Sequence, residues 1–176
     1  MRNDVSIRSA LIRAAGLICT LAAMSAHATC TGSGIGTPTC SATVSATSLS
    51  FGSYSAATTG ATTSTATVTV TATFSGNILG SSTLSYTVSL SAGNSGTTTS
   101  RYMSYGNYTL NYNLYTSSGY GTVWATDTVS GSASAGGGFG TRTATATHTV
   151  YGSLPAGQYT AAPGSYTDTI TVTVTY

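Results

Sequence analysis

The residues that could carry out chemistry are few and widely spaced. Beyond residue 28 the chain has a single histidine, His148, and only two carboxylates, Asp127 and Asp168. Ser95, in the Gly-Asn-Ser-Gly segment 93–96, could act as a nucleophile only beside a histidine that a buried carboxylate orients. Paired carboxylates, a phosphate-binding loop and metal-ligand spacing are all missing from the sequence. The sequence therefore predicts no catalytic residue, no metal site and no cofactor, and we do not expect an enzyme.

His148 belongs to a segment with the two-residue period of a β-strand. It occupies the same parity of position as Ala144, Ala146 and Val150. We therefore expect His148 at a strand face or at the rim of a sheet, without a catalytic role.

The first 28 residues have the pattern of a secretory signal peptide. Three arginines precede an apolar run over residues 14–23, and Ala-His-Ala at 26–28 supplies the small residues that a signal peptidase recognises. The run is shorter than the roughly 20 apolar residues of a transmembrane helix. We expect cleavage after Ala28. This divides the chain into a signal peptide (1–28), a short N-terminal disulfide loop (29–40) and one β-sandwich domain (41–176).

All of the net charge lies in these first 28 residues. The chain carries a formal net charge of +2, but beyond residue 28 Arg101 and Arg142 balance Asp127 and Asp168, without any lysine or glutamate. Nothing basic remains to hold phosphates, so we do not expect nucleic acid as a partner. The abundance of Thr, Ser, Gly, Tyr and Val favours strands and turns and argues against disorder.

Cys30 and Cys40 both follow the predicted cleavage site. Disulfides form and persist in exported proteins, so we expect these cysteines to pair and to close a loop that contains glycines and Pro38. A reactive cysteine pair or a metal site is the alternative. Two cysteines without partner histidines make a poor metal site, however.

Alternating apolar and polar residues predict six or seven strands. They lie at 43–51, 65–74, 83–90, 108–115, 122–125 (a short edge piece around Trp124), 143–151 and 166–176. Breaks rich in Gly, Ser and Asn separate them. The predicted fold class is all-β, an antiparallel two-sheet sandwich.

The C-terminal segment 166–176 has the clearest strand pattern. Threonines alternate without a break with Tyr166, Asp168, Ile170, Val172, Val174 and Tyr176. Burying each of the three aliphatic side chains is worth about 1.5–3 kcal/mol, which together approaches the about 5–15 kcal/mol stability of a typical domain. Whatever covers this face would therefore decide whether the domain folds. The alternative is an ordinary inner strand, paired on both sides within the chain.

Four segments resemble the spore coat protein U domain family. They are TVYGSLPAGQ (149–158), APGSYTDTITVTVTY (162–176), LNYNLYTSSGYGTVW (110–124) and ATSLSFGSY (46–54). The resemblance extends over nearly all of the chain from about Cys40. That family includes the pilins of archaic chaperone-usher pili of Gram-negative bacteria.

The resemblance implies an immunoglobulin-like sandwich that lacks its last strand. A periplasmic pilus chaperone would supply that strand first, and another pilus subunit would replace it at the outer-membrane usher. The protein would then be a secreted structural subunit of a surface pilus (fimbrium) or coat, exported through the periplasm, that supports adhesion or biofilm formation. The residues expected to form the donor-strand groove and the chaperone contact are Val44, Leu49, Phe51, Ile170, Val172, Val174 and Tyr176.

Two features depart from the family pattern. Members commonly have a second cysteine in a VTVTC segment, where this chain has Ala72, so the usual clamp between the first two strands is missing. Shaft pilins also carry an alternating apolar extension that they donate, whereas residues 29–39 contain Ile35 as their only large aliphatic residue. The chain is therefore expected to accept a strand more readily than it gives one, as a pilus tip subunit would. A self-contained secreted adhesin or binding domain is the competing interpretation.

A run of tyrosines could form an adhesive surface. Tyr102, Tyr105, Tyr115 and Tyr120 lie in a stretch that is also rich in Asn, Ser and Gly, a mixture suited to adaptable contacts. The alternative is that Tyr108 and Tyr112 belong to the core and the others are ordinary loop tyrosines.

Overall fold

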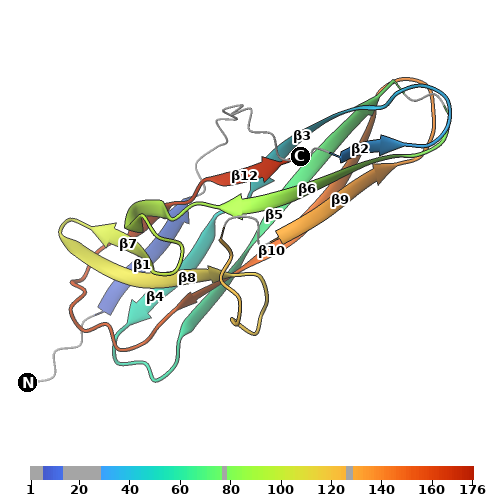
Figure 1. Cartoon of the computed structure of the whole chain (residues 1–176). Coiled ribbons are helices and arrows are strands. Elements are labelled where there is room, and N and C mark those ends of the chain that lie inside the picture. Colours follow the sequence, from blue (N-terminus) through green and yellow to red (C-terminus); the bar gives the residue numbers. More distant parts are fainter. Residues whose placement is uncertain (1–5, 14–28, 77–78, 126–128) are drawn as a thin grey trace, which may run out of the picture.

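The protein is an elongated two-sheet β-sandwich (Figure 1). The computed structural model describes residues 6–13, 29–76, 79–125 and 129–176. The predicted all-β antiparallel sandwich is confirmed. One pair of neighbouring strands, β1 and β11, runs parallel instead.

The described residues form twelve strands, nearly twice the predicted number. They are β1 (Ser6–Arg13), β2 (Thr29–Gly32), β3 (Thr39–Ala46), β4 (Leu49–Ser55), β5 (Thr62–Ser75), β6 (Ser82–Leu90), β7 (Arg101–Tyr105), β8 (Tyr108–Tyr115), β9 (Val129–Ala135), β10 (Arg142–Leu154), β11 (Thr167–Thr169) and β12 (Val172–Thr175). One sheet has the order β3-β5-β10-β8-β7-β11-β1-β4, and the other has the order β12-β6-β2 with β9 also paired to β6.

The long antiparallel pair β5–β10 forms the backbone of the molecule. It is in register from Arg142 opposite Phe74 to Leu154 opposite Thr62. In β5 the apolar residues of the alternating pattern that predicts this strand are buried from Ala66 to Phe74, at every second residue. Because a strand turns alternate side chains to opposite faces, this pattern fixes which side of β5 meets the second sheet.

Several predicted strand boundaries were wrong. The segment 43–51 is not one strand, because β3 ends at Ala46 and β4 begins at Leu49. The expected edge strand at 122–125 is reduced to an isolated bridge between Val123 and Tyr115. Strands β2, β7 and β9 were not predicted, since they are short or rich in Ser, Ala and Gly and carry a weak alternation signal.

The C-terminal segment is two strands, where the sequence predicts one. β11 pairs with β7 in the first sheet and β12 pairs with β6 in the second, so the chain passes from one sheet to the other near Ile170. At the crossing, Ser91 N donates a 2.9 Å hydrogen bond to Thr171 O, and Thr171 N donates one of 2.9 Å to Ser91 Oγ. The alternation of burial continues through the crossing, which is why the sequence shows no break there.

The predicted disulfide between Cys30 and Cys40 is confirmed, with Cα atoms 5.8 Å apart. Cys30 lies in β2, beside β6, and Cys40 lies in β3, beside β5. The bond therefore closes the 29–40 loop and also ties the two sheets together.

Replacing both cysteines, Cys30→Ser with Cys40→Ser, should lower the free energy of unfolding by about 3 kcal/mol, because the unfolded chain regains the entropy of an open loop. Denaturant unfolding of the exported chain measures this. The unmodified chain in reducing buffer is the matched control and should match the double variant. An unchanged midpoint after reduction would contradict this role.

Candidate functional site

The first sheet contains a position that β1, a strand within the predicted signal peptide, fills. β1 lies between β4 and β11. It is antiparallel to β4, with Ile12 opposite Leu49, and parallel to β11, with Arg13 opposite Thr169. Figure 1 shows β1 beside β4, near the end of the body opposite the β9–β10 loop. We call this position the β4–β11 gap.

The gap lies beside an apolar cavity between the two sheets. Leu49 at the start of β4 and Ile170 directly after β11 both line it. The remaining lining residues are Ala46, Thr47, Ala66, Val68, Leu90, Leu114, Val150 and Val172. An apolar side chain suits this cavity, because a polar group placed there would lose its hydrogen bonds to water.

The predicted groove residues have different positions. Leu49, Ile170 and Val172 line the cavity. Phe51, on β4, is buried against Tyr112 with ring centroids 5.9 Å apart. The other three predicted residues do not line the cavity: Val44 is buried opposite Val70, Val174 is half-buried opposite Val88, and Tyr176 is half-buried.

Sequence reasoning missed the cavity residues that come from β5, β6, β8 and β10. Each is an inward member of an alternating strand, but alternation alone does not say which inward residues border one cavity.

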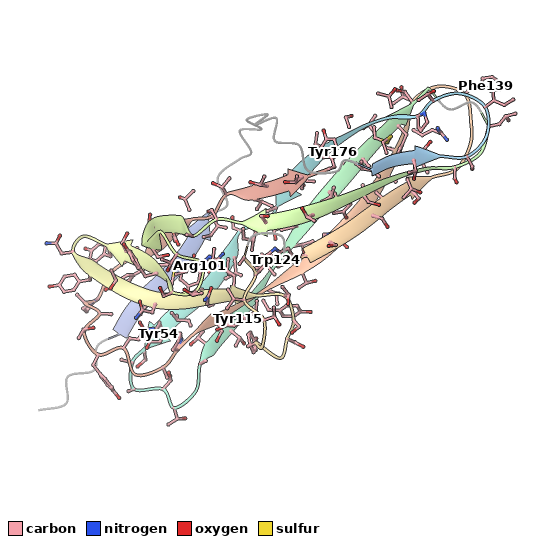
Figure 2. The ribbon with its side chains drawn as sticks, viewed as in Figure 1. Tyr54, Arg101, Tyr115, Trp124, Phe139 and Tyr176 are labelled. Carbon is pink, nitrogen blue, oxygen red and sulfur yellow. A yellow bond between two sulfur atoms is a disulfide. The ribbon has the colours of Figure 1, made fainter. Side chains whose placement is uncertain are left out.

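A buried arginine joins the segments that surround the chain crossing. Arg101 is fully buried at the start of β7, near Trp124 in Figure 2. Its Nε donates to Ser91 O at 2.9 Å. Its two terminal nitrogens donate to the backbone oxygens of Thr98, Leu90 and Trp124 at 3.2, 3.1 and 2.8 Å, and to Asn113 Oδ1 at 2.7 Å. Burial lowers the pKa of Arg101 from its usual value, whereas the nearby Tyr112 and Asp168 raise it.

A buried carboxylate holds β11 in place. Asp168 is 2% exposed. Its Oδ2 accepts a hydrogen bond from the Tyr112 hydroxyl at 2.7 Å, and its Oδ1 accepts from the backbone N–H groups of Asn94 and Thr169 at 2.8 and 2.7 Å. Burial is the main cause that raises the pKa of Tyr112, and its hydrogen bond to Asp168 adds to it. A side chain on Gly93 would collide with this carboxylate, so the turn before β7 can approach it only as glycine.

The polar network around Arg101 and Asp168 was not predicted as a site. Arg101 and Met103 share the inward face of β7. A charged residue at an inward position of a strand was therefore the one sequence signal that could have indicated this network. Every contact of this network is structural, and its carboxylate is committed to hydrogen bonds with Tyr112, Asn94 and Thr169. Among the described residues no cluster of His, Cys, Asp and Glu could hold a metal ion.

His148 is half-buried on β10, and its Nε2 lies 2.9 Å from the Tyr86 hydroxyl. Its ring packs edge-on against Tyr86 and Trp124, with centroids 5.8 and 6.3 Å away. Burial lowers the pKa of His148. These contacts agree with the expected position at a strand face.

The predicted tyrosine surface is divided between two places. Tyr102 and Tyr105 lie on β7, where Tyr105 packs against Tyr166 with centroids 5.9 Å apart. Tyr115 and Tyr120 instead pack edge-on against each other at 5.4 Å.

The alternative to an adhesive tyrosine surface placed Tyr108 and Tyr112 in the core. It is right for Tyr112 and wrong for Tyr108. Tyr112 is buried, but Tyr108 is 48% exposed because it begins β8 at the hairpin turn.

A family model, Spore Coat Protein U domain, matches residues 19–173 of the chain. The chain belongs to this family. The resemblance found in the sequence is thereby confirmed. No curated protein matches the chain.

Membership of the Spore Coat Protein U family fits a structural, pilin-like subunit of a pilus or coat that assembles with other subunits. In the described residues we find no helix long and apolar enough to cross a membrane.

The departure from the family's cysteine pattern has a local explanation in the structure. Ala72 of β5 lies opposite Ala42 of β3, so no disulfide joins these strands at that position. Cys40, two residues before Ala42, bonds to Cys30 in the other sheet. The disulfide of this family member therefore joins the two sheets.

Arg101→Met should destabilise the domain by at least about 3 kcal/mol, because Asn113 and several buried carbonyl groups lose their donor. Arg101→Lys should recover little of this loss, since an ammonium group cannot reproduce the planar fork of donors. Denaturant unfolding measures both variants. Arg142→Gln, which removes the same charge from a half-buried position, is the control and should cost clearly less. Equal losses at the two arginines would refute the assigned role.

Acid should destabilise the domain through His148. The folded state lowers the pKa of His148, so the unfolded state binds the proton more readily as the pH falls below about 6.5. Stability is then fully present above that pH and declines toward the folded pKa. We expect the melting temperature to fall between roughly pH 7 and pH 5, and His148→Gln should flatten this decline. Identical pH profiles for the two proteins would exclude this effect.

Proposed function

We propose that the protein is an exported structural subunit of a surface pilus or coat that accepts a donor strand in the β4–β11 gap. A periplasmic chaperone would fill the gap first, and another subunit would replace it at the outer-membrane usher. The assembled fibre would support adhesion or biofilm formation.

The observation that carries this proposal is the position of β1. It lies within the predicted signal peptide 1–28, whose cleavage site lies outside the described residues. Cleavage after Ala28 would remove β1 and expose the facing edge of β4 and one edge of β11. Unpaired edges recruit strands from other chains. Here the apolar cavity beside the two edges would let a donor strand bury its apolar side chains.

The buried charges support the same assignment. Asp168 ties β11 to Asn94 and Tyr112 through two hydrogen bonds. Arg101 holds Leu90 and Ser91, which run beside the chain crossing. These bonds do not involve β1. The two edges would therefore keep their positions for an incoming strand, which reduces the ordering cost of binding.

A terminal position in the fibre, or a self-contained adhesin, is the second candidate. The segment that should donate, residues 29–39, begins with β2, which pairs with β6 along its whole length. Cys30 is also bonded to Cys40. A strand committed to its own sheet cannot extend into a neighbour unless it first leaves that sheet. This favours a subunit that accepts without donating, as at a fibre tip, where Tyr102, Tyr105, Tyr115 and Tyr120 could contribute to adhesion.

The decisive experiment supplies a donor strand to the chain that begins at Thr29. A C-terminal extension with apolar residues at alternate positions, joined by a flexible linker, should convert an aggregating protein into a soluble monomer. It should add about 1.5–3 kcal/mol of stability for each large apolar side chain it buries. Yield and denaturant unfolding are the measurements.

The matched control carries the same extension with serine at each apolar position, and it should not rescue solubility. A soluble monomer that unfolds cooperatively without any extension, and gains nothing from the apolar one, would reject strand acceptance. It would favour the self-contained adhesin.

A further inference from the structure

The strands β12 and β2 lie end to end along the same edge of β6, because β9 covers the opposite edge. Thr175 of β12 is opposite Thr87, and Thr29 of β2 is opposite Ser85. Both strands are antiparallel to β6, so they run in the same direction. Between their paired residues this edge has a single position, opposite Tyr86. Figure 1 shows the end marked C between β12 and β2.

Tyr176 is the residue that brings these two strands into contact. It directly follows Thr175 in the sequence. Two positions along an antiparallel strand span about 7 Å, a length that one intervening residue fills. The main chain of Tyr176 and the backbone nitrogen of Thr29 therefore meet head to tail. We call this place the terminal junction.

The fold holds both sides of the terminal junction in place. Tyr176 is half-buried and packs against the hydrophobic core. On the other side Cys30, next to Thr29, is bonded to Cys40 in the first sheet. Ordering two mobile groups is a large part of what makes ordinary surface ion pairs weak. Groups placed at this junction would escape most of that cost.

Cleavage of the predicted signal peptide would put a charge at the terminal junction. The chain contains no lysine, so cleavage after Ala28 would make the α-amino group of Thr29 its one primary amine. In the chain Thr29–Tyr176 the α-carboxylate of Tyr176 would lie directly in front of this amine. Opposite charges would then meet at the one free position of the β6 edge.

The ionisable side chains around the terminal junction leave this pair without a competitor. On β6 the Tyr86 hydroxyl is buried and lies 2.9 Å from Nε2 of His148 on β10. Burial raises the pKa of Tyr86 and lowers that of His148, so both are neutral near pH 7. Arg142 reaches β6 at Ser82, which is opposite Gly32 at the other end of β2. Strands β3 and β9 carry no ionisable side chain besides the disulfide-bonded cysteine of β3, and Asp127 lies outside the described residues.

We propose that removal of the signal peptide lets the α-ammonium group of Thr29 pair with the α-carboxylate of Tyr176, so that β12 and β2 act as one continuous strand on β6. The pair ties the C-terminal segment, which also forms the β11 edge of the gap, to the disulfide-bonded N-terminal segment. The inference rests on the predicted cleavage, which the proposed function shares, and applies to the chain Thr29–Tyr176. It does not depend on strand acceptance.

The test uses the exported chain Thr29–Tyr176 with a blocked peptide of residues 6–13. The peptide, acetylated and amidated, takes the place of β1 and has no amine of its own. Labelling by an amine-reactive ester over a range of pH, read by mass spectrometry, gives the proton affinity of the Thr29 amine, because only its unprotonated form reacts. We expect this amine to bind its proton about tenfold more tightly in the folded chain than in the urea-unfolded chain, since a nearby carboxylate favours the charged form.

Two variants separate an ion pair from simple shielding of the amine. A Gly-Ser-Gly extension after Tyr176 moves the carboxylate away, and the proton affinity should return to within about twofold of the unfolded value. Tyr176→Phe keeps the carboxylate and is the matched control, so it should retain the increase. Shielding alone would slow labelling at every pH without changing the proton affinity. If the extended chain does not fold, a C-terminal amide made by semisynthesis removes the same charge.

The pH dependence of stability gives a second readout. The folded state favours the ammonium form, so the pair contributes fully below the ordinary α-amino pKa of about 7.7–8.0. Its contribution is lost as the pH rises through the higher pKa of the folded state. The melting temperature of the unmodified chain should therefore exceed that of the extended chain at pH 7 and match it by about pH 10.

Equal proton affinities in the folded and unfolded chains, or an increase that survives the extension, would overturn the proposal. A chain that folds without any peptide in the gap would count against strand acceptance instead. The same measurements are then made without the peptide, so the terminal junction and the proposed function are tested separately.

Discussion

The structure depends on one constraint: the edges of β4 and β11 must be covered. An open edge presents unpaired peptide groups, and here it also borders an apolar cavity between the sheets. In the structure β1, which lies within the predicted signal peptide, covers both edges. Under the proposed function, a separate segment would supply this part of the hydrogen bonding and of the apolar burial.

The edges of β4 and β11 can depend on β1 only because other contacts stabilise the framework around them. The β5–β10 ladder, the disulfide between the sheets and the bonds of Arg101 and Asp168 do not involve β1. They fix both sides of the gap with groups that are buried and hydrogen-bonded. Under the proposed function, the two edges would therefore already be in position when a strand arrives. A charged side chain at an inward position is costly unless all its donors are used, and Arg101 uses them on backbone carbonyls and Asn113.

The elongated shape separates two kinds of surface. Long strands carry the β2–β3 and β9–β10 loops away from the gap (Figure 1). Under the proposed function, partner strands would act at one end. At the other end the segments that follow β2, β5 and β9 pack closely through glycines and expose Ile35, Leu79 and Phe139.

The sequence by itself determined the class of fold, the family, the Cys30–Cys40 bond and the inward faces of β5, β6 and β8. All of these follow from local periodicity, from the spacing of a few residues or from motifs. The tertiary structure decided the rest. The alternation of apolar and polar residues in 166–176 is the same whether the segment lies in one sheet or crosses between two. Only the long-range strand pairing therefore shows the crossing near Ile170. The burial of Arg101, the borders of the cavity and the close approach of the segments that follow β2, β5 and β9 likewise depend on segments distant in the chain. Local sequence does not encode which distant backbone lies opposite, because strand pairing is a non-local choice.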